Sequence, residues 1–410
     1  MNYYLDNYAV RPQLIPDSVP RNLGVIVVIP CYNETQLTNS LQSLFDCTLP
    51  SCSVEIIVVI NASENSSPEI IKQNKKTLDE ALNWAETHQK NKLSYCFIEE
   101  NSLPKKHAGV GLARKIGMDE AVRRFETINH SNGVIVCFDA DAKCEKNYLI
   151  EIEKHFKALP KTPACSIHFE HPIAGEEFPE EIYHGIIQYE LYLRVYKNGL
   201  AYAGLPYAYH TIGSSMAVRN SAYQKQNGMN KRKAGEDFYF LQKLIPLGDF
   251  TEITTTKVIP SPRVSDRVPF GTGKAMGNFI VDSESEIQSY HVNSYADLKC
   301  FCELLPNLYD NPFVEFPTSL KDFLESIDWK IDCEKIRKNS TSKSHFVKLF
   351  YNWFNAFKVL KYMHFSRDNY YPDQPVFTAG NKLLSMLGEK EQGSLVLMLE
   401  TYRQIDQYHR

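Results

Sequence analysis

Features of several other protein classes are missing from this sequence. No stretch reaches the roughly 18 consecutive apolar residues that a membrane-spanning helix needs. None of the 10 cysteines forms a CxxC pair or a Cys/His set with the spacing of a zinc site. The formal net charge is -4, whereas a broad nucleic-acid surface normally needs clustered Lys and Arg. The sequence therefore argues against a membrane-spanning, zinc-binding or nucleic-acid-binding protein.

The beginning of the chain also lacks the apolar core of a signal peptide, since it contains Asp6, Asp17 and several prolines. Cysteines such as Cys96 and Cys137 lie inside apolar runs, which is typical of buried free thiols in a reducing compartment. We therefore expect a cytoplasmic protein with no transmembrane segment, at most peripheral to a membrane.

What the chain does have is enough length and apolar content for more than one structural unit. It has 410 residues, of which 43% are hydrophobic, and this exceeds what a single small core requires. Strand-like and helical patterns alternate up to about Pro260, and helical periodicity dominates beyond it. We expect an N-terminal arm, an α/β domain, a connecting loop rich in Pro and Gly, and a helical C-terminal region, over residues 1–21, 22–260, 261–283 and 284–410.

Four apolar runs predict the strands of the α/β domain. They cover residues 23–29, 54–60, 94–98 and 134–138, and segments of helical spacing near 37–45, 69–86 and 108–125 separate them. Strands that are apolar on both faces and alternate with helices indicate a mainly parallel, Rossmann-like sheet flanked by helices. In such a sheet, ligands bind beyond the carboxyl ends of the strands.

Polar residues follow three of these strands directly, at positions 32–34, 61–64 and 139–141. Because the carboxyl ends of parallel strands meet at one edge, we expect all three segments to lie along the same edge of the sheet. The pattern predicts a polar binding site at that edge.

Asp139-Ala140-Asp141 ends the fourth predicted strand. Two carboxylates at i and i+2 can turn toward one divalent cation, and such a cation can bridge a carboxylate to a diphosphate. A second acidic pair, Glu236-Asp237, precedes an apolar helical run, where one carboxylate could act as a general base. The alternatives are a solvated turn for the first pair and favourable acidic residues in a helix's first turn for the second.

Basic residues gather at two places. The segment 105–115 places Arg114 and several lysines around a predicted helix start, where phosphate groups are favoured, although no P-loop or dinucleotide fingerprint is present. Arg263 and Arg267 lie in the flexible segment before Gly271, and loops of this composition often close over an anion. An ordinary solvated surface remains the alternative for both.

Together these motifs resemble the family-2 glycosyltransferases with the GT-A fold. Residues 29–34 resemble the family's opening P-x-Y-N-E, and residues 111–117 resemble its G-x-x-x-A-R-x-x-G helix. Residues 139–141 are similar to its D-x-D motif, and residues 236–237 to its E-D pair. The loop after the second strand departs from the family, which commonly has Asp where this chain has Asn61. The resemblance covers roughly residues 22 to 260.

The resemblance implies roles for individual residues. Asp237 would be the catalytic base with Glu236 beside it, and Asp141, with Asp139, would bind a Mn²⁺ or Mg²⁺ ion. The nucleotide-sugar would be bound by Pro30, Tyr32, Asn33, Glu34, Asn61, Arg114, Asp139 and Ala140. The acceptor or phosphate side would include His210, Gly213 and Ser214, with His210 also a candidate third metal ligand, and the basic loop beyond the resemblance would add Arg263 and Arg267.

The function implied is inverting transfer of a sugar from a nucleoside-diphosphate sugar to an acceptor hydroxyl on a glycan, a lipid-linked molecule or a small molecule. The main alternative is a non-catalytic nucleotide-sugar or glycan-binding module on the same fold. A phosphatase-like hydrolase is disfavoured, because it would carry the D-x-D motif on its first strand. In the C-terminal region, a helix over 346–365 places several Phe side chains on one face, for packing against the catalytic domain or for binding a membrane surface.

Overall fold

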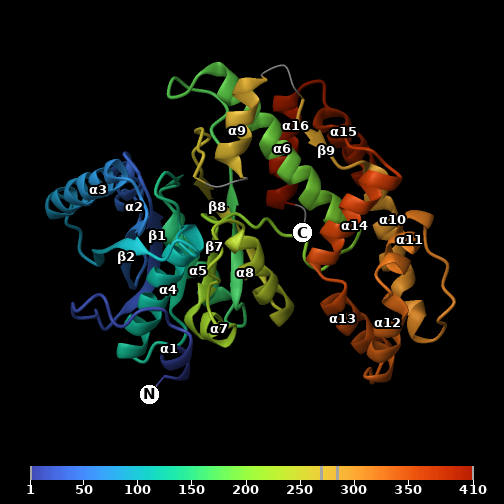
Figure 1. The fold of residues 1–410 in the computed structure, drawn as a ribbon, viewed down its shortest axis with the longest axis horizontal. Coiled ribbons are helices and arrows are strands. Elements are labelled where there is room, and N and C mark those ends of the chain that lie inside the picture. The colour runs from blue at the N-terminus through green and yellow to red at the C-terminus, as the bar shows by residue number, and fades with distance from the viewer. Residues whose placement is uncertain (1, 268–270, 283–285, 409–410) are drawn as a thin grey trace. The chain divides into compact units, whose positions relative to one another are not determined.

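The computed structural model of the chain describes residues 2–267, 271–282 and 286–408. It divides into two compact units, of which the first comprises Met1–Glu177 and Thr211–Gly277 and the second Phe178–His210 and Asn278–Arg410 (Figure 1). The sequence-based boundaries placed residues 178–210 within the α/β domain. In the structure they contain the long helix α6 (Glu180–Tyr202), which packs against the C-terminal helices α15 (Val376–Leu387) and α16 (Leu395–Tyr408).

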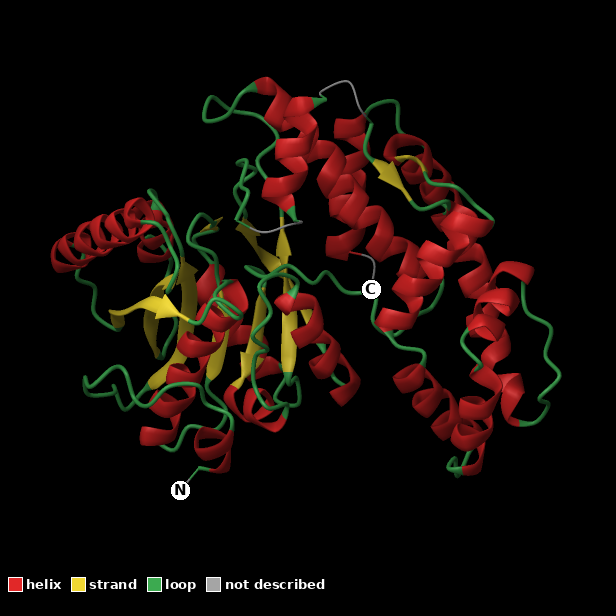
Figure 2. Cartoon of the chain, in the orientation of Figure 1, coloured by secondary structure: helices red, strands yellow, loops and turns green. Residues whose placement is uncertain are grey.

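The described part of the first unit is built on an eight-stranded sheet in the order β3-β2-β1-β4-β7-β6-β8-β5 (Figure 2). Neighbouring strands from β3 to β4 are parallel, and so are β6 and β8, whereas β7 and β5 run against their neighbours. The strands are β1 (Leu23–Cys31), β2 (Ser53–Ser63), β3 (Leu93–Leu103), β4 (Val134–Cys137), β5 (Lys143–Cys144), β6 (Ala164–Phe169), β7 (Met216–Arg219) and β8 (Thr251–Ile259).

Helices separate the strands, as the apolar periodicity predicted, so the mainly parallel sheet flanked by helices and the helical C-terminal region are confirmed. The first unit contains α1 (Tyr3–Asn7), α2 (Leu37–Phe45), α3 (Pro68–Thr87), α4 (Val110–Thr127), α5 (Tyr148–Ala158), α7 (Asn220–Lys225), α8 (Glu236–Leu244) and the short 3-10 helix η1 (Ile245–Leu247). The helix α9 (Thr272–Val281) crosses the boundary between the units.

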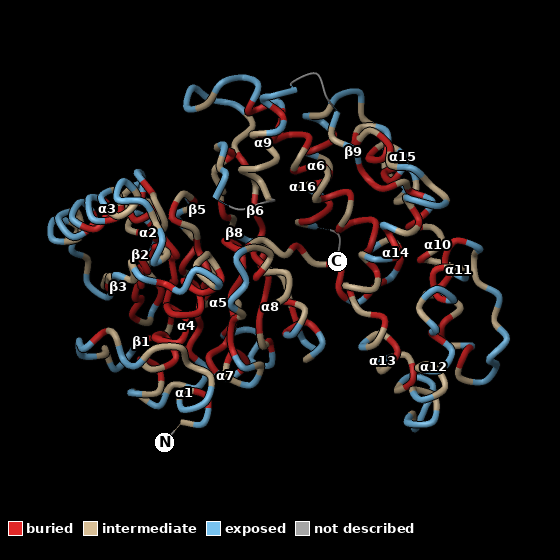
Figure 3. Tube along the Cα trace, viewed as in Figure 1, coloured by how far each residue is buried: buried red, intermediate tan, exposed pale blue. Residues whose placement is uncertain are grey.

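The strands β1, β2 and β4 form the centre of the buried core. Figure 3 shows buried segments in red around β1 and β2. Helix α4 lies directly on this core. A Cβ atom added to Gly117 of α4 would come within 2.5 Å of Val28 on β1 and 3.0 Å of Val59 on β2. Only glycine permits this close approach, which fixes the position of α4 over the strands.

Buried acidic residues on α4 hold the N-terminal arm in place. The Tyr4 hydroxyl donates to Asp119 over 2.5 Å, and the Val10 amide donates to the other oxygen of Asp119 over 3.1 Å. The Ile15 amide donates to Glu120 over 3.1 Å. The arm is therefore an ordered part of the first unit.

The second unit is mainly helical and has a short two-stranded sheet. Besides α6, α15 and α16 it contains β9 (Gln288–Ser289), α10 (Val292–Leu304), η2 (Leu305–Tyr309), α11 (Thr318–Ser326), α12 (Trp329–Lys338), α13 (Lys343–Trp353), α14 (Ala356–Asn369) and β10 (Gln374–Pro375).

The prediction of a single helix over 346–365 is wrong. The helix ends after α13, and a second helix, α14, begins at Ala356 with the Asn355 side chain as its N-cap. Phe346, Phe350 and Phe354 are fully buried, and the last two pack on Phe301 of α10. The aromatic stripe therefore belongs to the core of the second unit and is not exposed for a membrane surface. Among the described residues, every helix is too short or too polar to cross a lipid bilayer.

Candidate active site

The carboxyl ends of β2, β1 and β4 lie side by side. Cys31 at the end of β1 pairs with Ile60 of β2, and Val28 of β1 pairs with Cys137 of β4. Residues 32–34, 61–64 and 139–141 follow at or beyond these positions. The prediction that the three polar segments share one edge of the sheet is confirmed.

Arg114 joins the two acidic motifs of the sequence. Its Nη2 donates to Asp139 Oδ1 over 2.6 Å, and its Nη1 donates to Glu236 Oε1, although Arg114 and Glu236 are 122 residues apart in sequence. The Arg114 side chain is only 1% exposed, whereas that of Asp139 is 38% exposed. One buried guanidinium thus holds a buried carboxylate on one side and a solvent-accessible carboxylate on the other.

The surroundings of Arg114 explain how it reaches both partners. It lies in the first turns of α4, whose start is bonded to the loop before α8 through the Gly111 amide and the Arg232 carbonyl over 3.2 Å. A Cβ atom added to Gly213 would come within 2.8 Å of Arg114 Nη1. Gly213 therefore makes room for the guanidinium, a role that the sequence did not reveal.

Burial changes the ionisation of the acidic residues at the start of α8. It raises the pKa of Glu236 to about 7, against the opposing charge of Arg114, and the neighbouring Asp237 carboxylate adds to the rise. Burial also raises the pKa of Asp237, which Arg114 and the Phe238 amide oppose. Asp237 is half-buried and accepts from the Phe238 amide over 2.7 Å. A carboxylate with a raised pKa beside a cation is the type of group that serves as a general base.

Glu34 is fully buried, and it anchors two arginines of the segment before α9. Its Oε1 accepts from Arg263 Nη1 over 2.9 Å, and its Oε2 accepts from Arg263 Nη2 and from Arg267 Nη1, the latter over 3.1 Å. Arg267 also donates to the Asn33 carbonyl over 2.7 Å. Burial by itself would raise the pKa of Glu34. Arg263 and Arg267 outweigh this effect and lower that pKa below its ordinary value. Glu34 therefore faces two arginines.

Asp141 lies between these two groups of charges. Its Oδ2 is 2.7 Å from Arg263 Nη2, and its side chain is 29% exposed. Burial raises the pKa of Asp141, Arg263 opposes the rise, and Asp139 adds to it. Asp139 likewise raises the pKa of Asp237. The negative charge of Asp139 thus acts on both Asp141 and Asp237 and raises the pKa of each.

The other expected nucleotide contacts lie at the same edge with different surroundings. Asn61 is buried, and its amide donates to the carbonyls of Cys31 over 2.8 Å and Val59 over 3.3 Å. An aspartate could not make these bonds, so the amide links β2 to β1. Tyr32 and Asn33 are half-buried, with Asn33 in the left-handed region at φ 48. Of the last two expected contacts, Pro30 lies in β1 just before its end, and Ala140 follows the end of β4.

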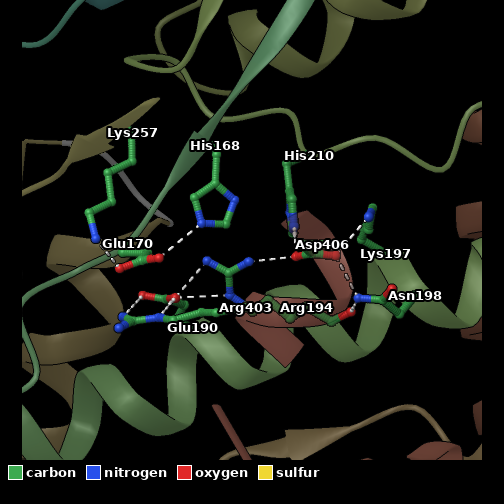
Figure 4. Close-up of polar contacts among 10 residues, drawn as sticks. All are labelled: His168, Glu170, Glu190, Arg194, Lys197, Asn198, His210, Lys257, Arg403 and Asp406. Carbon is green, nitrogen blue, oxygen red and sulfur yellow. Dashed lines mark hydrogen bonds and ion pairs between the residues drawn. The ribbon is translucent and has the colours of Figure 1, made fainter. Parts of the chain in front are cut away.

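The residues expected on the acceptor side are divided between the units. Gly213 and Ser214 lie in the first unit, and the buried Ser214 Oγ has no hydrogen-bond partner among the described residues. His210 lies in the second unit, where its Nε2 is 2.9 Å from Asp406 (Figure 4). The structure therefore gives His210 an acidic partner on α16.

Asp406 is the centre of a charge cluster that the sequence analysis missed. Besides His210, it contacts Arg194 Nη1 and Lys197 Nζ, the latter over 2.7 Å, and Arg194 also contacts Glu190 Oε1 over 2.7 Å (Figure 4). The spacing of Glu190 and Arg194, four residues apart on α6, is the one local signal that could have indicated part of it. Arg194 and Glu190 are fully buried, and Asp406 nearly so.

Among residues 2–267, 271–282 and 286–408, no three His, Cys, Asp or Glu side chains are grouped closely enough to form a metal site by themselves. The carboxylates of Asp139 and Asp141 are the acidic groups that the sheet edge brings close to Arg114 and Arg263.

Comparison with known proteins gives the family. The model of glycosyl transferase family 2 matches residues 26–225, and no curated protein matches the sequence. The solved structure of S. aureus TarS 1-349 in complex with UDP-GlcNAc is 13% identical, with a TM-score of 0.39, covering 94% of this chain and 93% of that chain. The structure of TarS 1-349 with UDP is 12% identical, with a TM-score of 0.38 over the same shares. The family match covers the sheet edge, Arg114 and the D-x-D motif, and residues 26–225 therefore form a glycosyl transferase family 2 domain.

Proposed function

We propose that the protein transfers a sugar from a nucleoside-diphosphate sugar to an acceptor hydroxyl, with inversion at the anomeric carbon and with Asp237 as the general base. The observation that carries this proposal is the Arg114 bridge. It joins Glu236, the neighbour of Asp237, to Asp139 of the D-x-D motif. A base for the acceptor and charged groups for the diphosphate are thereby held next to each other.

The reaction is a single displacement. The acceptor oxygen forms a bond to the anomeric carbon as the bond from that carbon to the diphosphate oxygen breaks. The acceptor proton passes to the Asp237 carboxylate, and the nucleoside diphosphate leaves with the electron pair. Attack from the face opposite the leaving group inverts the anomeric centre. Arg263 and Arg267, both partly exposed, supply positive charge for the leaving diphosphate.

The donor set at the sheet edge fits a divalent cation that arrives with its substrate. Mg²⁺ sites in nucleotide-dependent enzymes commonly use one or two carboxylates together with substrate phosphates and water. Asp141 and Asp139 are two carboxylates of this kind, and they would hold the ion. When bound, a Mn²⁺ or Mg²⁺ ion would neutralise negative charge on the diphosphate.

The assignment of the base is tested with Asp237→Asn. Nucleoside diphosphate release is measured from a panel of nucleoside-diphosphate sugars, with water or added sugars as acceptors. We expect the turnover of the variant to fall about 10²- to 10⁴-fold, the usual contribution of general base catalysis, while donor binding persists.

Asp249→Asn is the matched control, because Asp249 is exposed in the same unit and its left-handed backbone tolerates asparagine. Turnover by Asp237→Asn at the rate of this control would eliminate Asp237 as the base. Absence of donor hydrolysis and of transfer in the unmodified protein, with donor binding intact, would favour a non-catalytic binding module.

A further inference from the structure

Arg263 contacts one of the two Asp141 carboxylate oxygens that a metal ion could use. Its Nη2 lies 2.7 Å from Asp141 Oδ2, and the same guanidinium is anchored to the buried Glu34. The Asp141 side chain is 29% exposed and that of Arg263 is 22% exposed, so both can be reached from solvent. A cation bound to the same carboxylate would lie close to the Arg263 guanidinium, and the repulsion between the two positive charges would oppose its binding.

Glu34 restricts where Arg263 can go when it leaves Asp141. Three donors other than Arg263 hold the Glu34 carboxylate in place: the Thr35 amide over 2.9 Å, the Gln36 amide over 3.0 Å and Arg267 over 3.1 Å. The Thr77 hydroxyl further bonds the Glu34 carbonyl. A guanidinium tethered to so fixed an anion stays beside Asp141 after displacement, and its free N–H groups then face whatever has displaced it.

The segment that carries Arg263 is itself held in place. The Ser265 amide donates to the Gly273 carbonyl over 3.1 Å, at the start of α9. The Arg263 amide donates to Ser261 Oγ over 3.3 Å. The exchange of partners therefore requires a movement of the Arg263 side chain and not of the whole segment.

On the basis of the proposed function, we infer that Arg263 is an exchangeable counter-ion of Asp141, with Glu34 as its positioning residue. Without substrate, Arg263 neutralises Asp141 and opposes binding of a bare divalent cation. When a cation arrives with a diphosphate, the cation takes Asp141, and Arg263 turns to the phosphate oxygens, with which it can form two parallel hydrogen bonds. The site thus selects the metal–diphosphate complex over the free metal.

The test measures binding of Mn²⁺ alone, and of the 1:1 Mn²⁺–pyrophosphate complex, to the full-length chain, by electron paramagnetic resonance of free Mn²⁺ and by calorimetry. For Arg263→Gln we expect Mn²⁺ alone to bind about tenfold tighter and the pyrophosphate complex about tenfold weaker than in the unmodified protein. Arg267→Gln is the control, since Arg267 shares Glu34 but forms no ion pair with Asp141 in the described residues; its Mn²⁺ affinity should change less than about twofold.

A double-mutant cycle separates positioning by Glu34 from a merely structural role. Glu34→Gln retains an acceptor for the Thr35 and Gln36 amides. It should weaken the Mn²⁺–pyrophosphate complex about fivefold in the unmodified protein and less than about twofold in the Arg263→Gln background. Equal effects in both backgrounds would reject the positioning role, and unchanged Mn²⁺ affinity in Arg263→Gln would reject the exchange. Failure of the unmodified protein to bind the Mn²⁺–pyrophosphate complex would instead refute the metal-dependent function itself.

Discussion

Each unit of this protein contains a fully buried arginine that bridges two carboxylates, yet the two bridges differ in exposure. Arg194 in the second unit pairs with Glu190 and Asp406, whose side chains are 0% and 2% exposed. Arg114 in the first unit pairs with the buried Glu236 and with Asp139, which is 38% exposed. We call the Arg194 bridge closed, because both of its carboxylates are buried, and the Arg114 bridge open, because Asp139 is exposed to solvent.

The difference shows what each bridge can do. A closed set of charges fastens helices together, in this case α6 to α16, and cannot receive a ligand without unfolding. An open set keeps one carboxylate available to water, metal ions and substrate, while its buried arginine fixes the geometry. Breaking one partner of a buried pair is strongly destabilising, whereas an exposed partner contributes little to stability. Matched Asp→Asn substitutions in the two bridges therefore separate stability from function.

The largest effect on stability is expected for Asp406→Asn. This change removes the negative charge that faces Arg194 and Lys197 in the interior of the second unit. The free energy of unfolding should fall by about 3–5 kcal/mol, because buried cations lose their counter-charge. Urea denaturation followed by circular dichroism measures it. A loss below about 1 kcal/mol would mean that the closed bridge is not what fastens α16.

Opposite responses of the two units to pH are expected to be the next largest effect. The pKa of Glu236 is raised to about 7, so the folded state binds its proton more tightly than the unfolded state. Its contribution to stability is therefore greatest at low pH and declines as pH rises from about 4.5 to 7, by up to about 3 kcal/mol.

Asp406 acts in the other direction. Burial by itself would raise the pKa of Asp406. Its basic neighbours outweigh this effect and hold that pKa well below its ordinary value; they are His210, Lys197 and Arg194. Its stabilisation is present above about pH 4 and is lost as pH falls below that range. Hydrogen exchange of α8 and α16 between pH 2 and 8 reports the two units separately, and Glu236→Gln should flatten the response of α8 alone. Parallel responses of α8 and α16 would contradict the assignment.

The smallest effect on stability is expected for Asp139→Asn, the counterpart of Asp406→Asn in the open bridge. Arg114 keeps Glu236 as a partner, and Asp139 is partly solvated, so the unfolding free energy should change by less than about 1 kcal/mol. Affinity for the Mn²⁺–pyrophosphate complex should nevertheless fall about tenfold, because a carboxylate of the proposed cation site is neutralised. Calorimetry on both Asp→Asn variants makes the comparison. A destabilisation as large as that of Asp406→Asn would remove the distinction between the bridges.

Much of the first unit could be predicted from sequence because its signals are local. The apolar run ending at Cys31 and the one before Asp139 are β-branched and unbroken, which is typical of parallel strands covered on both faces. The break between α13 and α14 was missed because the spacing of Phe350, Phe354 and Phe357 continues across it, while the Asn355 cap is a single-residue signal. The membership of α6 in the second unit was missed because it depends on packing against α15 and α16.

The gathering of acidic residues at the carboxyl edge of the sheet follows from the sequence, since the alternation of apolar runs and helices sets the strand direction. Which charges meet depends on the folded structure. The pairs Arg114–Glu236 and Arg263–Glu34 join residues 122 and 229 positions apart, and no periodicity connects positions at such distances. Exposure was likewise decided in three dimensions: Asp139 and Asp406 are the same residue type beside a buried arginine, and only the packing around them leaves one open to solvent and closes the other.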